Sequence, residues 1–307
     1  MTLKFKEIKK HLNDFEYIDC PLCWEWYKNT RTLFKNDNWL PDHKRICKRC
    51  WLIYQSPRLT DKDINKFYNE FYLNDYMWRG CEWNSKHFSH GLKRKSEINI
   101  FYNEIKNAKN PIEIGCSSWG VLKVLSDIND KFYWIDIDGG AIEFAKKQWL
   151  NAEKEDIFKL KDNIYDFVIM SHVVEHLLNI DSFLKKVNEI LTDKGLLLIF
   201  VPDSYKAYEP GNLPHTLYFT EETLISMITK YWFVIKKNIQ KNNRPKKFKK
   251  DIIILFQKEK DSKQQKSRYN WWEFSLLKIK LLIVRIIIKT LEATKTKNII
   301  KKILYKT

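Results

Sequence analysis

The stretch Tyr165-Asp-Phe-Val-Ile-Met-Ser171 holds four consecutive apolar residues and ends on a serine. A short apolar run of this kind is typical of a strand that is buried on both faces of a sheet. A second run, Gly195-Leu-Leu-Leu-Ile-Phe-Val201, follows after an amphipathic stretch through Phe183, Val187 and Leu191. This strand–helix–strand order predicts a βαβ unit in a parallel sheet.

The same alternation extends in both directions from these two runs. Further strands are expected at residues 111–115, 132–136, a short stretch ending near Asp156, 232–235 and 251–256. The last two are separated by a polar loop too short for a crossover, so we expect them to form an antiparallel hairpin. The sequence therefore predicts an α/β protein with a Rossmann-like sheet of seven strands, mostly parallel with an antiparallel last strand.

Composition and periodicity divide the chain into four parts. We expect a cysteine-containing module over residues 1–60, a helical connector over 61–109, the sheet domain over 110–258 and a basic amphipathic tail over 259–307. The first part shows little periodic structure. The second part alternates aromatic and polar clusters at helical spacing.

The chain of 307 residues carries a formal charge of +17 and is 44% hydrophobic and 15% aromatic, which excludes a disordered chain. The charge favours a polyanionic partner or an anionic membrane surface, although lysine that only solubilises the surface explains it equally well. The N-terminus has no apolar region of a signal peptide, and no stretch approaches the ~20 apolar residues of a spanning helix. We therefore expect a cytoplasmic protein.

Four of the six cysteines form two Cys-x-x-Cys pairs, with 23 residues between them. This spacing is typical of a zinc-ribbon-like module, because each pair directs two thiolates from a tight turn towards one tetrahedral ion. Two redox pairs or four unrelated thiols are the alternatives. Four thiolates would close the coordination sphere, so the expected Zn²⁺ is structural; its ligands would be Cys20, Cys23, Cys47 and Cys50.

Small and acidic residues follow the first three expected strands. The turn Gly115-Cys-Ser-Ser-Trp-Gly120 lies where a strand leads into a helix, whose free N–H groups suit a close-lying ligand. Asp136 ends the second strand, where a carboxylate can accept from both hydroxyls of a ribose. Asp156 ends the third, where an acid can accept from the exocyclic amine of adenine. Each carboxylate alone could be an ordinary solvated loop residue, but all three features occur at successive strand ends.

The sheet domain resembles the class I S-adenosylmethionine-dependent methyltransferases. The resemblance rests on the stretches 165–176, 183–191 and 194–202, with Leu213-Pro-His-Thr-Leu-Tyr-Phe-Thr220 added from one branch of these enzymes. The cysteine pairs, with the stretches 50–58 and 67–72, are similar to the zinc-binding domain that precedes such methyltransferases in sugar and surface-polysaccharide pathways. The resemblance implies methyl transfer from S-adenosylmethionine to a nucleotide sugar or a surface glycan.

The resemblance also implies a set of cofactor-binding residues along the strand ends. They are Glu113, Gly115, Cys116, Ser117, Gly120, Asp136, Ile137, Asp156, Ile157, Ser171 and His172. The chain departs from the family at one place, since the usual Gly-x-Gly-x-Gly becomes a turn with the bulky Trp119. A non-catalytic binding protein on a degenerate methyltransferase fold therefore stays as an alternative.

Two histidines are candidates for catalysis at the acceptor. His176 follows the fourth strand and His215 lies in the loop after the fifth, so both are expected at the carboxyl edge, where ligands bind in such sheets. A histidine that titrates near neutrality suits the removal of a proton from an acceptor hydroxyl. Alternatively, His176 could pack beneath the pocket and His215 could only order its loop.

Basic segments suggest a phosphate-bearing acceptor. The loop 236–250 holds lysines and an arginine and no acid, and it should emerge at the cofactor edge if the strand before it runs parallel to the sheet. The tail segment 271–291 begins with two tryptophans and carries a cationic stripe, which fits peripheral contact with an anionic membrane, packing on the protein body or a second subunit. An RNA methyltransferase is the rival enzyme, with nucleic acid as its partner.

Overall fold

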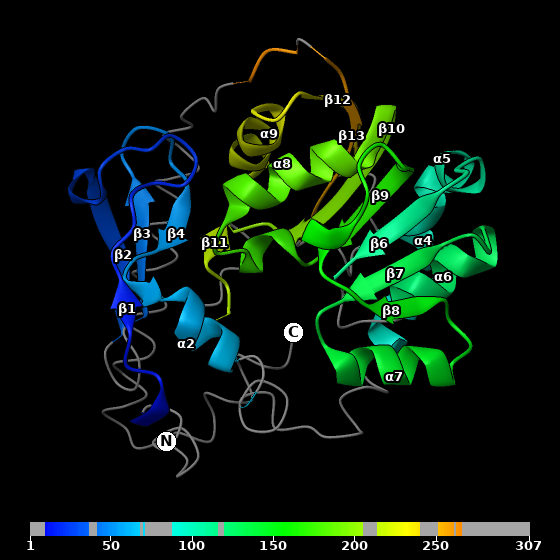
Figure 1. Ribbon diagram of the computed structural model, residues 1–307. Helices are drawn as coiled ribbons and strands as arrows, with labels where there is room; N and C mark the ends of the chain where they lie inside the picture. Colours follow the sequence, from blue (N-terminus) through cyan, green and yellow to red (C-terminus); the bar gives the residue numbers. More distant parts are fainter. Residues whose placement is uncertain are drawn as a thin grey trace, which may run out of the picture. The chain divides into compact units, whose positions relative to one another are not determined.

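A seven-stranded sheet forms the centre of the part of the chain after residue 110 (Figure 1). The computed structural model describes residues 10–36, 42–67, 70, 88–115, 120–204, 214–239, 251–260 and 262–265, all within one unit, Met1–Ser267. The strands lie in the order β12-β13-β10-β9-β6-β7-β8. Their bounds are β6 (Pro111–Ile114), β7 (Tyr133–Asp136), β8 (Ala152–Lys154), β9 (Tyr165–Ser171), β10 (Leu191–Pro202), β12 (Phe233–Asn238) and β13 (Asp251–Lys258).

The direction of the strands confirms the predicted sheet. Strands β8, β7, β6, β9 and β10 pair in parallel, and β13 is antiparallel to both β10 and β12, so β12 points the same way as the other strands. The basic loop 240–250 lies outside the described residues. Its two ends are at the carboxyl edge, because β12 ends there and β13 begins there.

Helices cover both faces of this sheet. On one face α8 (Ile180–Ile190) and α9 (Glu221–Thr229) bury aliphatic side chains against the strands. On the other face lie α4 (Lys95–Ile98), α5 (Tyr102–Lys106), α6 (Gly120–Ile128) and α7 (Gly139–Lys147). Local sequence fixes where two of them begin, since Asp138 accepts hydrogen bonds at the start of α7 and Thr220 forms a capping box at the start of α9. Short 3₁₀ turns are η1 (Tyr27–Asn29), η3 (Asn99–Phe101), η4 (Ile157–Lys159) and η5 (Val174–His176).

A second, four-stranded sheet occupies the N-terminal part (Figure 1). It consists of β2 (Thr30–Asn36), β3 (Asp42–Cys47), β4 (Ile53–Gln55) and β11 (Leu217–Tyr218), in the order β11-β4-β3-β2. The sequence before residue 60 shows little periodic pattern, yet the structure forms strands there. Strands such as β3, with the sequence Asp-His-Lys-Arg-Ile-Cys, are too polar to show an alternating pattern. The pair β1 (Phe15–Glu16) and β5 (Arg58–Leu59) and the helix α2 (Asp61–Lys66) complete this part.

The edge strand β11 comes from a part of the sequence distant from the other three strands. It follows β10 of the large sheet in sequence, yet it pairs with β4, and Gln55 N donates to Thr216 O at 2.8 Å. The Arg58 guanidinium also donates to Leu178 O at 2.7 Å. One continuous apolar cluster includes the cysteines together with residues of β11 and α9. The cysteine-containing part and the large sheet therefore share a core.

No helix among the described residues is long and apolar enough to cross a membrane. The tail segment 271–291, for which we predict contact with a membrane, with the protein body or with a second subunit, lies outside the described residues.

Candidate active site

The first strand of the large sheet ends in the turn that was expected to approach the cofactor. Gly115 has a φ of +56°, a left-handed conformation that favours glycine, and a Cβ there would lie 3.3 Å from the Val173 side chain. The cofactor candidates Cys116 and Ser117, together with Trp119, lie outside the described residues.

Gly120, at the other end of this turn, is explained by helix packing. A Cβ on Gly120 would lie 2.0 Å from the carbonyl oxygen of Phe88, and Gly91 opposes it at similarly short range. The first turn of α6 thus crosses the segment around Gly91 with backbone against backbone. Sequence reasoning gave Gly120 a cofactor role, and the structure supplies a packing reason for the same glycine.

Asp136 is the last residue of β7, and its half-buried carboxylate accepts a hydrogen bond from Asp138 N at 2.9 Å. The next residue, Ile137, has 64% of its surface exposed at this edge. Strand β8 ends beside them, since Glu155 N donates to Asp136 O at 3.2 Å. The structure therefore brings the two strand ends together.

Asp156 and Ile157 follow β8. The exposed Asp156 carboxylate accepts from Phe158 N at 3.1 Å and so caps η4, whereas the Ile157 side chain is buried beneath it. An acid next to a buried aliphatic residue suits the polar edge and the apolar face of an adenine ring.

Two polar candidates are buried within the sheet. Glu113 of β6 is fully buried, and Ser171, which ends β9, is 1% exposed. Within the described residues the Ser171 hydroxyl has no hydrogen-bond partner. Because buried hydroxyls are normally hydrogen-bonded, the Ser171 hydroxyl at the carboxyl edge suits a ligand that offers it a polar group.

His172 is held by side chains of three different elements. Its Nδ1 lies 3.1 Å from Glu175 Oε1 and its Nε2 lies 2.6 Å from Arg94 Nη2. Burial and the Arg94 charge oppose ring protonation, whereas the carboxylates of Asp251 and Glu175 raise the pKa of His172. His172 was expected to close the cofactor pocket, and the structure shows it as part of this polar network.

The two catalytic candidates lie next to each other, although 38 residues separate His176 from Pro214, the neighbour of His215. The rings of His176 and His215 are 4.7 Å apart, edge to face. His176 Nδ1 lies 3.1 Å from Pro214 O, which fixes that nitrogen as the donor and leaves Nε2 as the basic atom. Burial lowers the pKa of His176, and burial with the charges of His176 and Lys44 lowers that of His215. Both rings are therefore neutral at pH 7 and able to accept a proton.

Glu175, His176 and His215 place their ligand atoms within 4.8 Å of one another, a donor set that divalent metals can use. The Lys44 ammonium, which donates to His215 O at 3.2 Å, adds a positive charge next to this set. Like charges repel at such range, so the Lys44 ammonium disfavours a metal ion at this set.

The four cysteines of the N-terminal part converge on one point. Sγ of Cys20 lies 3.3 Å from that of Cys50, Sγ of Cys23 lies 3.6 Å from that of Cys47, and all four fall within 4.8 Å. Thiolates around a tetrahedral Zn²⁺ at 2.3 Å are about 3.8 Å apart, so the set has the right size. Four thiolates this close to one another repel strongly, so all four can be deprotonated together only around a cation.

Sequence reasoning missed four charged residues that meet these histidines. Glu175 stands between His172 and His176 in a motif that was quoted only for its resemblance, and Asp251 opens the last strand. Arg94 and Lys44 carry no local signal, because their partners are distant in sequence.

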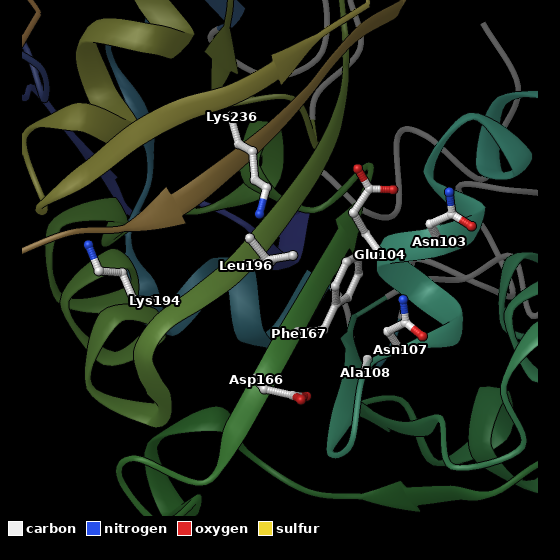
Figure 2. Close-up of a pocket in the computed structure, with 9 residues that line it drawn as sticks. All are labelled: Asn103, Glu104, Asn107, Ala108, Asp166, Phe167, Lys194, Leu196 and Lys236. Carbon is white, nitrogen blue, oxygen red and sulfur yellow. The ribbon is translucent and has the colours of Figure 1, made fainter.

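An open hollow lies at the opposite edge of the sheet (Figure 2). Its walls include Asp166 and Phe167 at the start of β9 and Lys194 and Leu196 in the first part of β10, with Lys236 from β12. The residues from β9 and β10 stand toward the amino ends of two central strands. The hollow is therefore separate from the candidate site at the carboxyl edge.

A comparison with protein families found a match in the middle of the chain. A family model described as a methyltransferase domain matches residues 88–233, just under half of the chain. No curated protein matches the sequence.

Similar solved structures include S-adenosylmethionine-dependent methyltransferases from Archaeoglobus fulgidus and Aquifex aeolicus. The first is 19% identical with a TM-score of 0.43, and the match covers 53% of this chain and 92% of the other chain. The second is 17% identical with a TM-score of 0.44 and covers 57% and 97%. The N-methyltransferase NodS from Bradyrhizobium japonicum is 16% identical with a TM-score of 0.44 and covers 55% and 96%. Likenesses at this distance assign no acceptor.

The matched range includes the turn after β6, the ends of β7, β8 and β9, and both His176 and His215. Over residues 88–233 this chain is similar to a methyltransferase domain.

Proposed function

We propose that the protein transfers a methyl group from S-adenosylmethionine to a hydroxyl or carbon of a sugar, carried as a nucleotide sugar or within a surface glycan. The observation that supports this most directly is the pair His176 and His215 at the carboxyl edge. Methyl transfer from a sulfonium is an in-line displacement, so alignment supplies most of the acceleration, and a hydroxyl acceptor also needs a base.

The cofactor would lie along the ends of β6, β7 and β8. In this arrangement Asp136 holds the ribose hydroxyls, Asp156 and Ile157 flank the adenine, and the turn after Gly115 passes beneath the methionine part. S-adenosylmethionine supplies the electrophilic methyl group, and the buried Ser171 hydroxyl offers a polar contact near the reacting end. The two histidines then face the acceptor, and the base would be His215, assisted by His176.

The four cysteines would bind one structural Zn²⁺. Their closed set of sulfur ligands leaves no coordination position for a substrate. The ion would instead fix the two knuckles, at residues 20–23 and 47–50, that flank β2 and β3.

The acceptor is proposed to carry phosphate. Both ends of the basic loop 240–250 are at the cofactor edge, and this loop contains lysines and an arginine but no acid.

We also propose that the tail 271–291 binds peripherally to the inner face of an anionic membrane. Each Lys or Arg near such a surface contributes about 1 kcal/mol to binding. Sedimentation with anionic liposomes at low salt, and release at high salt, tests this second point; a chain that ends at Lys260 should stay in solution at both salt concentrations.

The experiment that tests the function has two steps. Calorimetric titration with S-adenosylhomocysteine should show one binding site, and mass spectrometry should then detect a gain of one methyl group on a nucleotide sugar from a panel that includes free sugars and RNA. A His215→Gln variant should bind S-adenosylhomocysteine normally and lose transfer by about 10²-fold or more. Methylation of RNA and of no sugar would overturn the proposal, and absence of S-adenosylhomocysteine binding would overturn its cofactor half.

A further inference from the structure

The N-terminal sheet contributes a fully buried cation next to the acceptor histidines. Lys44 lies on β3 and is 0% exposed. Its ammonium group donates to His215 O at 3.2 Å and lies 4.9 Å from the centre of the Tyr218 ring. A buried lysine is expensive unless it has partners. Here two of its contacts lie in the segment that carries the proposed base.

Backbone pairing brings this segment to Lys44. In the four-stranded sheet β11 lies next to β4 and β4 next to β3, and Gln55 N donates to Thr216 O. Thr216 in turn donates through its N–H to Glu175 O at 2.9 Å. His215 is thus fixed from both sides, by the N-terminal sheet and by the turn that carries Glu175 and His176.

Gln55 stands directly opposite Lys44 in the pairing of β3 with β4. Residues paired in this way point to the same face of a sheet, with their Cβ atoms ~5 Å apart. Gln55 is 1% exposed, and neither atom of its side-chain amide has a hydrogen-bond partner in the part of the chain that the structure describes. A buried amide left in this state is costly, and a bound molecule with hydroxyl groups would satisfy it.

We propose that the face of the N-terminal sheet formed by Lys44 and Gln55 is a wall of the acceptor site, where Lys44 positions His215 and Gln55 binds a hydroxyl of the acceptor. The inference rests on the proposed function and deepens it. The cysteine-containing part is then a component of the catalytic unit, and the identity of the residue at position 55 helps to select the acceptor.

Lys44 also has an electrostatic effect on the base. The groups that face His215 are Glu175, His176, His172, Lys44 and the ring of Tyr218. After burial and the charge of His176, the Lys44 charge is the next cause that lowers the pKa of His215. With Lys44 removed, the pKa of His215 should rise towards its usual value. The fall in rate at acid pH would then begin at a higher pH, because the base must be neutral to accept a proton.

The first experiment needs no acceptor. Histidine ring protons of the full-length protein are titrated by NMR, with His215 assigned from the His215→Gln spectrum. In Lys44→Met the His215 midpoint should move upwards, while Lys44→Arg, which keeps the charge, and Lys28→Met, an exposed lysine of the same sheet region, should leave it in place. Equal S-adenosylhomocysteine affinity in all variants shows that the cofactor half is intact. An unchanged midpoint in Lys44→Met overturns the role of Lys44.

The second experiment uses the acceptor found for the wild-type protein. Gln55→Leu should raise the KM for that acceptor about tenfold with kcat and S-adenosylhomocysteine affinity retained, and the exposed Gln148→Leu should change neither. An unchanged KM in Gln55→Leu overturns the role of Gln55. If the wild-type protein binds S-adenosylhomocysteine but methylates no sugar, the proposed function fails while the NMR titration still decides the role of Lys44. Gln55→Glu provides a second test, and a melting temperature equal to that of the wild type shows that this variant is folded. The KM for a phosphate-bearing acceptor should rise in Gln55→Glu by the same factor as in Gln55→Leu.

Discussion

Arg94 and Asp251 form an ion pair across 157 residues of sequence, with Nη2 2.8 Å from Oδ2 and each side chain only 10% exposed. The pair connects the segment before α4 with the first residue of β13. It therefore ties the helical part that precedes the sheet to the strand that completes it.

Breaking this pair from one side should destabilise the protein strongly. Arg94→Met leaves a buried carboxylate without its cation, which costs roughly 3–5 kcal/mol in the free energy of unfolding. Urea denaturation at pH 7 measures the loss, and the double variant Arg94→Met with Asp251→Asn should recover part of it. A loss below about 1 kcal/mol in the single variant would show that solvent reaches the carboxylate.

The same pair gives a pH dependence. Burial alone would raise the pKa of Asp251, but the charges of His172 and Arg94 outweigh it and hold the pKa below its usual value. A carboxyl group with a lowered pKa stabilises the fold above its unfolded pKa of about 4, and this stability is lost as the pH falls further. The free energy of unfolding should therefore decrease below about pH 4 by less in Asp251→Asn than in the wild type.

The crossing at Gly91 and Gly120 should tolerate no side chain. In Gly120→Ala the new methyl group meets the backbone of Phe88 and Leu92, and overpacking of this kind costs about 1–3 kcal/mol. The matched control is Gly139→Ala, where the nearest atoms belong to the flexible Lys154 side chain at 3.6 Å. Thermal unfolding should show a lower melting temperature for the first variant and an equal or higher one for the second.

The ribose assignment of Asp136 predicts a loss of cofactor affinity. Asp136→Ala should weaken S-adenosylhomocysteine binding by about 1.5–3 kcal/mol for each charged hydrogen bond removed. The exposed Asp127→Ala serves as control. Calorimetry that gives equal dissociation constants for Asp136→Ala and the wild type would place the ribose elsewhere.

Loss of zinc should destabilise the whole protein, because the cysteines share a core with the large sheet. Purified protein should contain one zinc per chain, and Cys20→Ser or Cys50→Ser should abolish it. Because the cysteines pack in the same apolar cluster as residues of β11 and α9, the melting temperature of the whole protein should fall, and not that of the N-terminal segment alone. Metal analysis that finds no zinc in freshly reduced wild-type protein would contradict the site.

The local sequence pattern was enough to predict the strands of the large sheet, but it did not predict those of the small sheet. Strand β9 agrees with its expected bounds because four apolar residues stand between polar ends, whereas β10 begins at Leu191, four residues before the expected start, because Thr192–Lys194 are polar. The cysteine spacing, and the histidines that follow β9 and β10, could be read from the sequence for the same local reason. The contact of Lys44 with His215 spans 171 residues and depends on the pairing of β11 with β4, for which neither short strand gives a signal.

The pairing of β11 with β4 has a consequence for fragments of this protein. A polypeptide that ends before residue 88 would fold with the backbone groups of β4 uncovered along one edge, and open edges of this kind recruit other chains. Such a fragment should aggregate when it is produced alone. A synthetic peptide spanning residues 214–220, added in trans, should cap that edge and keep the fragment monomeric.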